Sequence, residues 1–245
     1  MEQKSFTLGA RLEACAALVR RGKIPADIGT DHAYLPIWLV EHGAVPRAFA
    51  SDINEEPIQS ARRNISVHGL NEKIITFTAN GLEKVPQNEV DDVIIAGMGG
   101  DNIAAILNGA NWLKNPRYRL ILQPMSRASR LREYLMRNGF GILTETAVCE
   151  AGRVYTVICA EYSGQGVSYS EFDIYAGKLD NSDPNASVLL MKQAAILRSA
   201  ADGRSAQGDM EASEHYMQLA EQLEELARGG KRDGDGTSQR CLSAD

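Results

Sequence analysis

Residues 24–36 place a glycine between two carboxylates at the end of an apolar run. The stretch reads Ile-Pro-Ala-Asp-Ile-Gly-Thr-Asp-His-Ala-Tyr-Leu-Pro, which predicts a short buried strand, a turn at Gly29 and the start of a helix. Asp27 lies at the strand end and Asp31 inside the turn. The first strand-to-helix turn of a doubly wound α/β domain is where a nucleotide-like cofactor binds. Gly29 permits a close approach of backbone to ligand, and the helix N-terminus offers free N–H groups to an anionic group.

Three further predicted strands, at residues 45–51, 74–78 and 92–96, also end in polar residues or glycines. In an open parallel sheet these carboxyl ends face one crevice. Asp52 lies 25 residues beyond Asp27, near the position where an acidic group accepts hydrogen bonds from ribose hydroxyls, which suits an adenosine moiety. The predicted cofactor-binding residues are Asp27, Gly29, Thr30, His32, Asp52, Ile53, Asn80, Gly81, Gly97, Met98, Gly99 and Gly100.

Each of these residues also has an ordinary structural explanation. Asp31 could cap the following helix, His32 could be structural, and Tyr34 could pack in the core instead of stacking on a base. The later strand ends are also common loop and turn sequences. Their joint placement at four successive strand ends favours a site.

The elements around these residues alternate between strand and helix. Helices are predicted at residues 8–21, 33–42, 56–68, from 102, and 129–138, with a fifth strand at 119–123. Two strands at 141–148 and 154–161 then follow without a helix between them, which predicts an antiparallel hairpin. That ending is typical of the S-adenosylmethionine-dependent methyltransferase variant of the doubly wound fold. An oxidoreductase is less favoured, because the first turn lacks Gly-x-Gly-x-x-Gly.

Several sequence blocks together resemble the TrmK family over residues 5–162. They are Arg11-Leu12, Ala26–Pro36, Ala50–Asp52, Asn80–Leu82, Ala96–Gly100, Ile121–Pro124, Arg132, Gly139-Phe140 and Glu145 to Tyr155. The resemblance implies an S-adenosyl-L-methionine-dependent tRNA methyltransferase that acts on N1 of adenine at tRNA position 22. It also implies a Rossmann-like class I methyltransferase domain, with a mostly parallel sheet and a terminal antiparallel hairpin, and a small C-terminal coiled-coil-like helical domain.

Asp31 and Tyr34 are the predicted catalytic residues. Adenine N1 carries a ring lone pair and becomes cationic as the methyl group arrives, so a nearby carboxylate would stabilise the charge. The base must be unpaired or extruded for N1 to be reached. Phosphate contacts would come from a local basic face, with Arg11, Arg20, Arg21, Lys23, Arg127 and Arg130 as candidates. Ordinary solvated surface charge is the alternative for each cation.

The net charge of −6 argues against a protein that coats nucleic acid, although a local basic face remains compatible with it. Four scattered cysteines (Cys15, Cys149, Cys159 and Cys241) favour reduced thiols in the cytoplasm and predict no metal site. The first ten residues have no apolar signal core, and no 18-residue apolar run occurs, so no membrane association is expected.

Two amphipathic helices follow residue 164 and predict a helical hairpin, which could contact tRNA or mediate dimerisation. We expect a methyltransferase domain at 1–163, a helical domain at 164–228, a disordered tail at 229–245, and a monomer or weak dimer. Two other functions stay open. One is methyl transfer to another RNA position or to a non-nucleic-acid substrate, and the other is a non-catalytic RNA- or cofactor-binding module.

Overall fold

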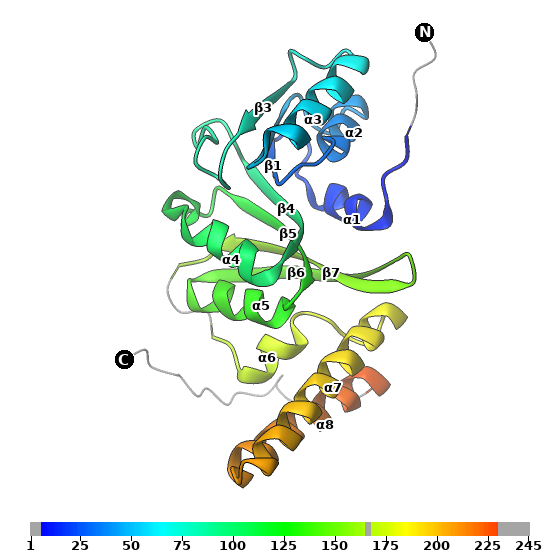
Figure 1. Ribbon diagram of the computed structural model, residues 1–245, viewed down its shortest axis with the longest axis vertical. Coiled ribbons are helices and arrows are strands. Elements are labelled where there is room, and N and C mark those ends of the chain that lie inside the picture. The colour runs from blue at the N-terminus through cyan, green and yellow to red at the C-terminus, as the bar shows by residue number, and fades with distance from the viewer. Residues whose placement is uncertain (1–5, 165–167, 230–245) are drawn as a thin grey trace.

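A seven-stranded sheet forms the centre of the N-terminal part of the computed structural model, which describes residues 6–164 and 168–229 (Figure 1). The strand order is β3-β2-β1-β4-β5-β7-β6. The strands are β1 (Pro25–Ile28), β2 (Ala48–Asp52), β3 (Ile74–Thr78), β4 (Asp92–Gly99), β5 (Arg119–Ser126), β6 (Phe140–Glu150) and β7 (Arg153–Tyr162). The first five strands are parallel, and β7 lies antiparallel between β5 and β6. The predicted fold class and terminal hairpin are confirmed.

Helices cover both faces of this sheet, as the apolar runs of the central strands require. All four residues of β1 are buried, and alternate residues of β4 enter different cores: Val93 and Ile95 one, Ile94 the other. The helices are α1 (Ala10–Leu18), α2 (Tyr34–Glu41), α3 (Glu55–Val67), α4 (Gly100–Asn108) and α5 (Ala128–Arg137), with a short 3-10 turn at Asn111–Leu113. The first three pack in the core that holds Ile94, and α4 and α5 in the other. The order in which strands are added to the sheet therefore changes direction between β1 and β4, where such folds bind ligands.

Two sequence predictions are wrong in detail. The fourth strand does not end in a turn at Gly97–Gly100; it continues to Gly99 through two register shifts against β5, and α4 begins at Gly100. Gly97 takes a φ of +82°, which accommodates a bulge without breaking the ladder. The first helix ends at Leu18, not at residue 21, because the backbone N–H of Arg20 donates to Asp92 (2.8 Å).

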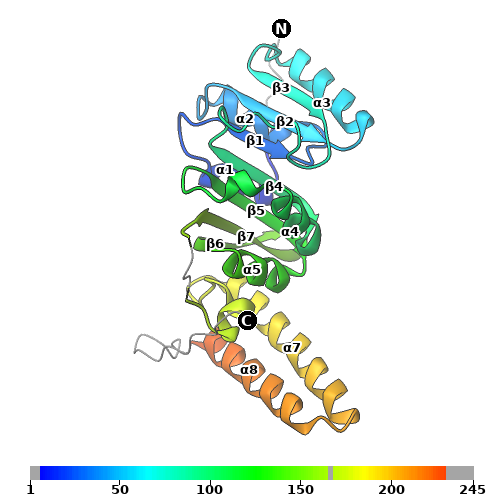
Figure 2. The ribbon, with the colours of Figure 1, turned by 90° about the vertical axis from the view of Figure 1, so that its left-hand side faces the viewer.

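Three helices follow the sheet, namely α6 (Glu171–Ala176), α7 (Pro184–Ala206) and α8 (Met210–Arg228). The sequence did not predict α6, a six-residue helix with a capping box between Ser170 and Asp173. The predicted hairpin is present, and α7 and α8 extend away from the sheet as an antiparallel pair (Figure 2). Their seam shares one apolar cluster with Ala147 of β6.

A buried ion pair connects this helical part to the sheet. The Arg132 guanidinium of α5 pairs with Glu145 of β6 at 2.6 Å and donates to the carbonyls of Ile174 and Tyr175 in α6 (3.2 and 2.9 Å). Glu145 also accepts from the backbone N–H of Lys178 (3.0 Å). The boundary at residue 163 stays a prediction, and the predicted tail lies outside the described residues from position 230 on. None of the helices in the described ranges is both long and apolar enough to cross a bilayer.

Candidate functional site

The turn after β1 lies directly against the end of β4. Backbone N–H groups of Gly29 and Thr30 both donate to the Ser51 carbonyl of β2 (2.7 and 2.9 Å), which fixes the turn. Gly29 has a φ of +78°, and a Cβ at this position would overlap the terminal methyl group of Met98. The sheet therefore brings the predicted first and fourth strand ends into contact.

Asp27 lies beneath this turn as a buried carboxylate. Burial raises its pKa from 3.8 to about 6, and a hydrogen bond with Thr30 opposes part of that shift. The Thr30 hydroxyl also accepts from the backbone N–H of Ala33 (3.2 Å). Asp27 and Thr30 thus hold the turn from below, and their contacts are internal to it.

Asp31 does not cap α2, so the structural alternative for this residue is wrong. The N-cap position is Ala33, in the left-handed region, with no side-chain cap hydrogen bond. The Asp31 side chain is 74% exposed and its Oδ2 lies 3.2 Å from Nε2 of His32. A carboxylate is therefore presented to solvent at the carboxyl ends of the parallel strands. This edge of the sheet, where the predicted cofactor residues lie, is called the cofactor edge below.

An aromatic surface lies beside Asp31. Tyr34 is 43% exposed and its ring lies 5.2 Å from the rings of both His32 and Phe6, which does not support core packing for Tyr34. Asn64 of α3 donates to the His32 carbonyl (3.0 Å) and so holds this segment in place, a role that the sequence did not reveal.

The ends of β2 and β3 lie next to each other. The backbone N–H of Ala79 donates to the Asp52 carbonyl (2.9 Å), which brings Asn80 towards Asp52. One Asp52 carboxylate oxygen accepts from the backbone N–H of Asn54 (2.8 Å), and within the described residues the other has no partner. Asn80 contacts Glu83 (3.1 Å), and Ile53 is largely exposed. Gly81 has a φ of +53° and packs over a side chain of α4.

Gln123 of β5 is the residue that sequence reasoning missed at the β4 bulge. This fully buried side chain accepts from the backbone N–H of Gly97 (3.1 Å) and from the Arg11 guanidinium (2.8 Å). Arg11 also pairs with Glu150 and lies 5.3 Å from the Tyr155 ring. In the sequence, only the presence of a glutamine within an otherwise apolar strand could have indicated this role of Gln123. Arg11, predicted to bind tRNA, thus has internal contacts that support the bulge.

The other predicted RNA-contacting cations fall into two groups. Arg20, Arg21 and Lys23 lie at the amino ends of β1 and β4, on the edge opposite the cofactor residues. Arg20 is bound to buried Asp92 (2.6 Å). By contrast, Arg127 and Arg130 follow β5 on the cofactor edge, where they pair with acidic neighbours but stay mostly exposed. The structure therefore brings together the predicted cofactor residues and separates the predicted tRNA residues.

The assembled edge offers backbone at three glycines of positive φ (Gly29, Gly81 and Gly97), carboxylate acceptors, and an exposed acid beside aromatic rings. Carboxylate acceptors suit the hydroxyl groups of a sugar, and an exposed carboxylate beside aromatic rings suits a ring that carries positive charge. Among the residues described, no group of three or more His, Cys, Asp or Glu side chains could hold a metal ion.

Comparison with known proteins agrees with this arrangement. Residues 8–158 match the family described as methyltransferase domain. The tRNA (adenine(22)-N(1))-methyltransferase of Bacillus subtilis is 37% identical over 172 residues, which is 70% of this chain and 72% of that protein. The solved structure of B. subtilis TrmK superposes with a TM-score of 0.77 at 30% identity, covering 91% and 98% of the two chains. A Streptococcus pneumoniae protein solved with S-adenosyl-L-methionine gives a TM-score of 0.71 at 38% identity, covering 84% and 98%.

Proposed function

The chain belongs to the family of tRNA (adenine(22)-N(1))-methyltransferases, and from that premise we propose that it transfers a methyl group from S-adenosyl-L-methionine to N1 of adenine 22 in tRNA. The observation that carries this proposal is the 37% identity to the B. subtilis enzyme over 70% of the chain. The gathered strand ends support it independently.

The residues at the cofactor edge fit S-adenosyl-L-methionine. A Cβ at Gly97 would meet no atom within 4 Å, so the backbone here borders open space that a ligand can approach. Asp52 has a free acceptor for ribose hydroxyls, and we assign Asn80 to the adenine edge. When bound, the cofactor supplies an electrophilic methyl group. Gly100 has a separate packing reason to be glycine, because a Cβ there would overlap the Arg127 carbonyl.

We assign the target adenine to the surface made by Asp31, His32 and Tyr34. The adenine ring would stack on the exposed Tyr34 ring, and Asp31 would face its N1–N6 edge. The carboxylate accepts a hydrogen bond from the N6 amino group and stabilises the positive charge that develops on the ring. No strong base is needed, because N1 attacks with a ring lone pair, so positioning and electrostatics supply the acceleration.

Access to N1 requires the base to leave any pairing partner. The exposed position of Asp31 and Tyr34 is compatible with a base that enters from solvent. We propose the cytoplasm, where unmodified tRNA is present, as the compartment, and a monomer or weak dimer as the working state.

The test is to incubate purified protein and cofactor with an unmodified tRNA transcript and to map methylated positions by nuclease digestion and mass spectrometry. We expect one N1-methyladenine at position 22 and none in the same transcript with guanine there. Methylation elsewhere, or of protein or small molecules without tRNA, would overturn the assignment. Normal tRNA binding without transfer would indicate a non-catalytic module.

A further inference from the structure

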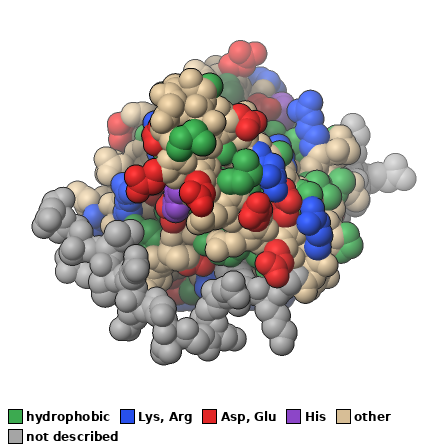
Figure 3. Space-filling view, turned by 90° about the horizontal axis from the view of Figure 1, so that it is seen from below, with side chains coloured by type: hydrophobic (Ala, Val, Ile, Leu, Met, Phe, Trp, Pro, Cys, Tyr) green, Lys and Arg blue, Asp and Glu red, His purple; other side chains and the backbone are tan. Residues whose placement is uncertain are grey.

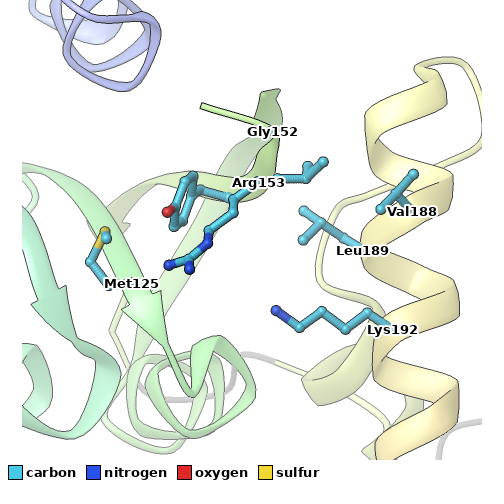
Figure 4. A pocket seen from close by; sticks show the side chains of 8 residues that line it. Met125, Gly152, Arg153, Val188, Leu189 and Lys192 are labelled. Atoms are coloured by element: carbon cyan, nitrogen blue, oxygen red, sulfur yellow. The ribbon is translucent and has the colours of Figure 1, made fainter. Parts of the chain in front are cut away.

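A cleft with a volume of about 400 Å³ separates the tip of the β6–β7 hairpin from helix α7. Its floor and walls come from three parts of the chain: the end of β5, the hairpin tip and the first turns of α7 (Figure 4). The side chains that matter are Met125, Arg153, Tyr155, Val188 and Lys192. The cleft therefore lies between the sheet and the helical part, and both contribute to its lining.

Two cations line this cleft from opposite sides. Arg153 extends from the hairpin and Lys192 from α7, and both side chains point into the space between the two elements (Figure 4). Both residues are exposed, and within the described residues neither takes part in an ion pair. Glu150, opposite Arg153 in the hairpin register, is already paired with Arg11. Two cations without carboxylate partners favour an external anion.

The cleft is connected to the cofactor edge by direct contacts. Met125 on its wall accepts from the Arg11 guanidinium (3.4 Å), which bonds Gln123 (2.8 Å), which in turn holds the Gly97 backbone (3.1 Å). Tyr155, also on the wall, lies 5.3 Å from the same guanidinium. The cleft is therefore linked, through Met125, Arg11 and Gln123, to the Gly97 backbone at the end of β4.

The wider surface does not attract RNA by net charge. The chain carries a net charge of −6, and acidic and basic side chains are interspersed on the face seen from below (Figure 3). A polyanion must therefore be held by local sets of unpaired cations and not by a broad field. The cleft is such a set, with Val188 and Leu189 as an apolar wall for a sugar.

We propose that Arg153 and Lys192 form a phosphate clamp for the tRNA backbone in the cleft between the β6–β7 hairpin and α7. This deepens the proposed function and rests on it. The clamp spans the two parts of the molecule, so α7 contributes directly to substrate binding. Its ligand is a phosphodiester group of the bound tRNA.

The test compares the Arg153→Ala/Lys192→Ala double variant with the wild-type protein. We expect tRNA binding to weaken about tenfold and the slope of log K against log salt to fall in magnitude by about 1.5 to 2, one phosphate contact per cation. KM for tRNA should rise while kcat at saturating tRNA and cofactor affinity stay unchanged. The charge-retaining Arg153→Lys/Lys192→Arg variant should bind tRNA like the wild type.

The matched control removes the same charge elsewhere. Lys73 and Lys114 are exposed, and within the described ranges neither side chain has an ion-pair partner. Both lie before the amino ends of strands, on the far edge of the sheet. The Lys73→Ala/Lys114→Ala variant should bind tRNA with the wild-type slope, and thermal unfolding should show that both double variants fold.

Three results would overturn the clamp. They are an unchanged slope in the cleft variant, an equal loss in the control variant, or a changed oligomeric state in sedimentation with tRNA binding intact. Failure of the proposed function can be distinguished from failure of the clamp, because the proposed function is tested by the position that the wild-type protein methylates. If the wild-type protein methylates tRNA at a position other than 22, the assignment to adenine 22 is wrong. The clamp proposal would still hold if the double variant binds that tRNA more weakly than the wild type.

Discussion

Asp31 presents an exposed carboxylate whose described contact is His32, at 3.2 Å. Because it caps no helix, its removal should not disturb the fold. We expect Asp31→Ala and Asp31→Asn to lower kcat roughly 100-fold, since a charge-stabilising group is lost from the transition state. Cofactor affinity, measured by calorimetry, should stay near wild type.

Glu72 supplies the control for Asp31. It is an exposed carboxylate before β3, and Glu72→Ala should leave kcat unchanged. A fall in cofactor affinity as large as the fall in kcat would contradict the proposed role and place Asp31 among the cofactor contacts.

The raised pKa of the Asp27 carboxyl group predicts that the stability of the protein depends on pH. Its pKa of about 6 in the folded protein exceeds the ordinary 3.8 because of burial. The folded state therefore binds the proton more tightly than the unfolded chain, and Asp27 costs stability as pH rises from about 4 to about 6, with a constant cost above. Asp27→Asn cannot titrate, so its stability relative to wild type should rise across this window, by at most about 3 kcal/mol.

Urea unfolding of both proteins at pH near 4 and near 7.5 checks this prediction. Other titrating groups are common to the two proteins and cancel in the difference. A stability difference that stays constant with pH would show that Asp27 does not carry the raised pKa.

Residue types revealed the site only in part, and the arginines show why. Arg20 and Arg21 are adjacent and looked equivalent in the sequence. In the structure Arg20 is paired with buried Asp92, whereas Arg21 is exposed and, among the described residues, has no ion-pair partner. A buried carboxylate 72 residues away decides the difference. Long-range pairing of this kind leaves no local pattern, which is also why Gln123 was missed.

At the scale of elements, the connection from β4 to α4 depends on Gly100. A Cβ there would overlap the backbone carbonyl of Arg127, which cannot rotate away. We expect Gly100→Ala to lower the free energy of unfolding by about 1–3 kcal/mol through overpacking. Denaturant unfolding measures this loss.

Gly203 provides the matched glycine. It lies inside α7, and a Cβ would meet no atom within 4 Å. Gly203→Ala should therefore stabilise the protein by up to about 1 kcal/mol, because alanine favours the helix. Equal effects of the two substitutions would contradict the packing assigned to Gly100.

Many elements were predictable from the spacing of a few apolar residues. The α7 seam at Leu190, Ala194, Leu197 and Ala201 is buried as its spacing predicts. The β4 bulge was not predictable, since a glycine run is equally compatible with a turn and its outcome depends on pairing with β5. Helix α6 was missed because six residues contain too little of a helical period.

At the scale of the molecule, the Arg132–Glu145 pair decides whether the helical part stays in place. Both side chains are almost fully buried. Arg132→Ala should cost about 3–5 kcal/mol, because it leaves a buried carboxylate without its partner. The Arg132→Met/Glu145→Leu double variant should lose less, and a double-mutant cycle with the Arg132→Met and Glu145→Leu single variants, unfolded in urea, measures the coupling.

Loss of the Arg132–Glu145 pair should also affect tRNA binding. If α6–α8 help to hold tRNA, loosening them should raise KM for tRNA and leave cofactor affinity unchanged. Arg198→Ala, which removes an ion pair within the helical hairpin and away from the sheet, is the control. Loss of cofactor affinity in the Arg132 variant alone would instead indicate damage to the sheet.

The position of β7 has a consequence for synthesis on the ribosome. Because β7 lies between β5 and β6 in the sheet but follows both in the chain, β6 emerges before the strand that joins it to the rest. Until residue 153 appears, β5 and β6 each present an unpaired edge, the kind of edge that invites aggregation. Ten residues then close both edges together. The nascent chain is thus most vulnerable just before its catalytic half is complete, and the helices that follow can dock only on a finished sheet.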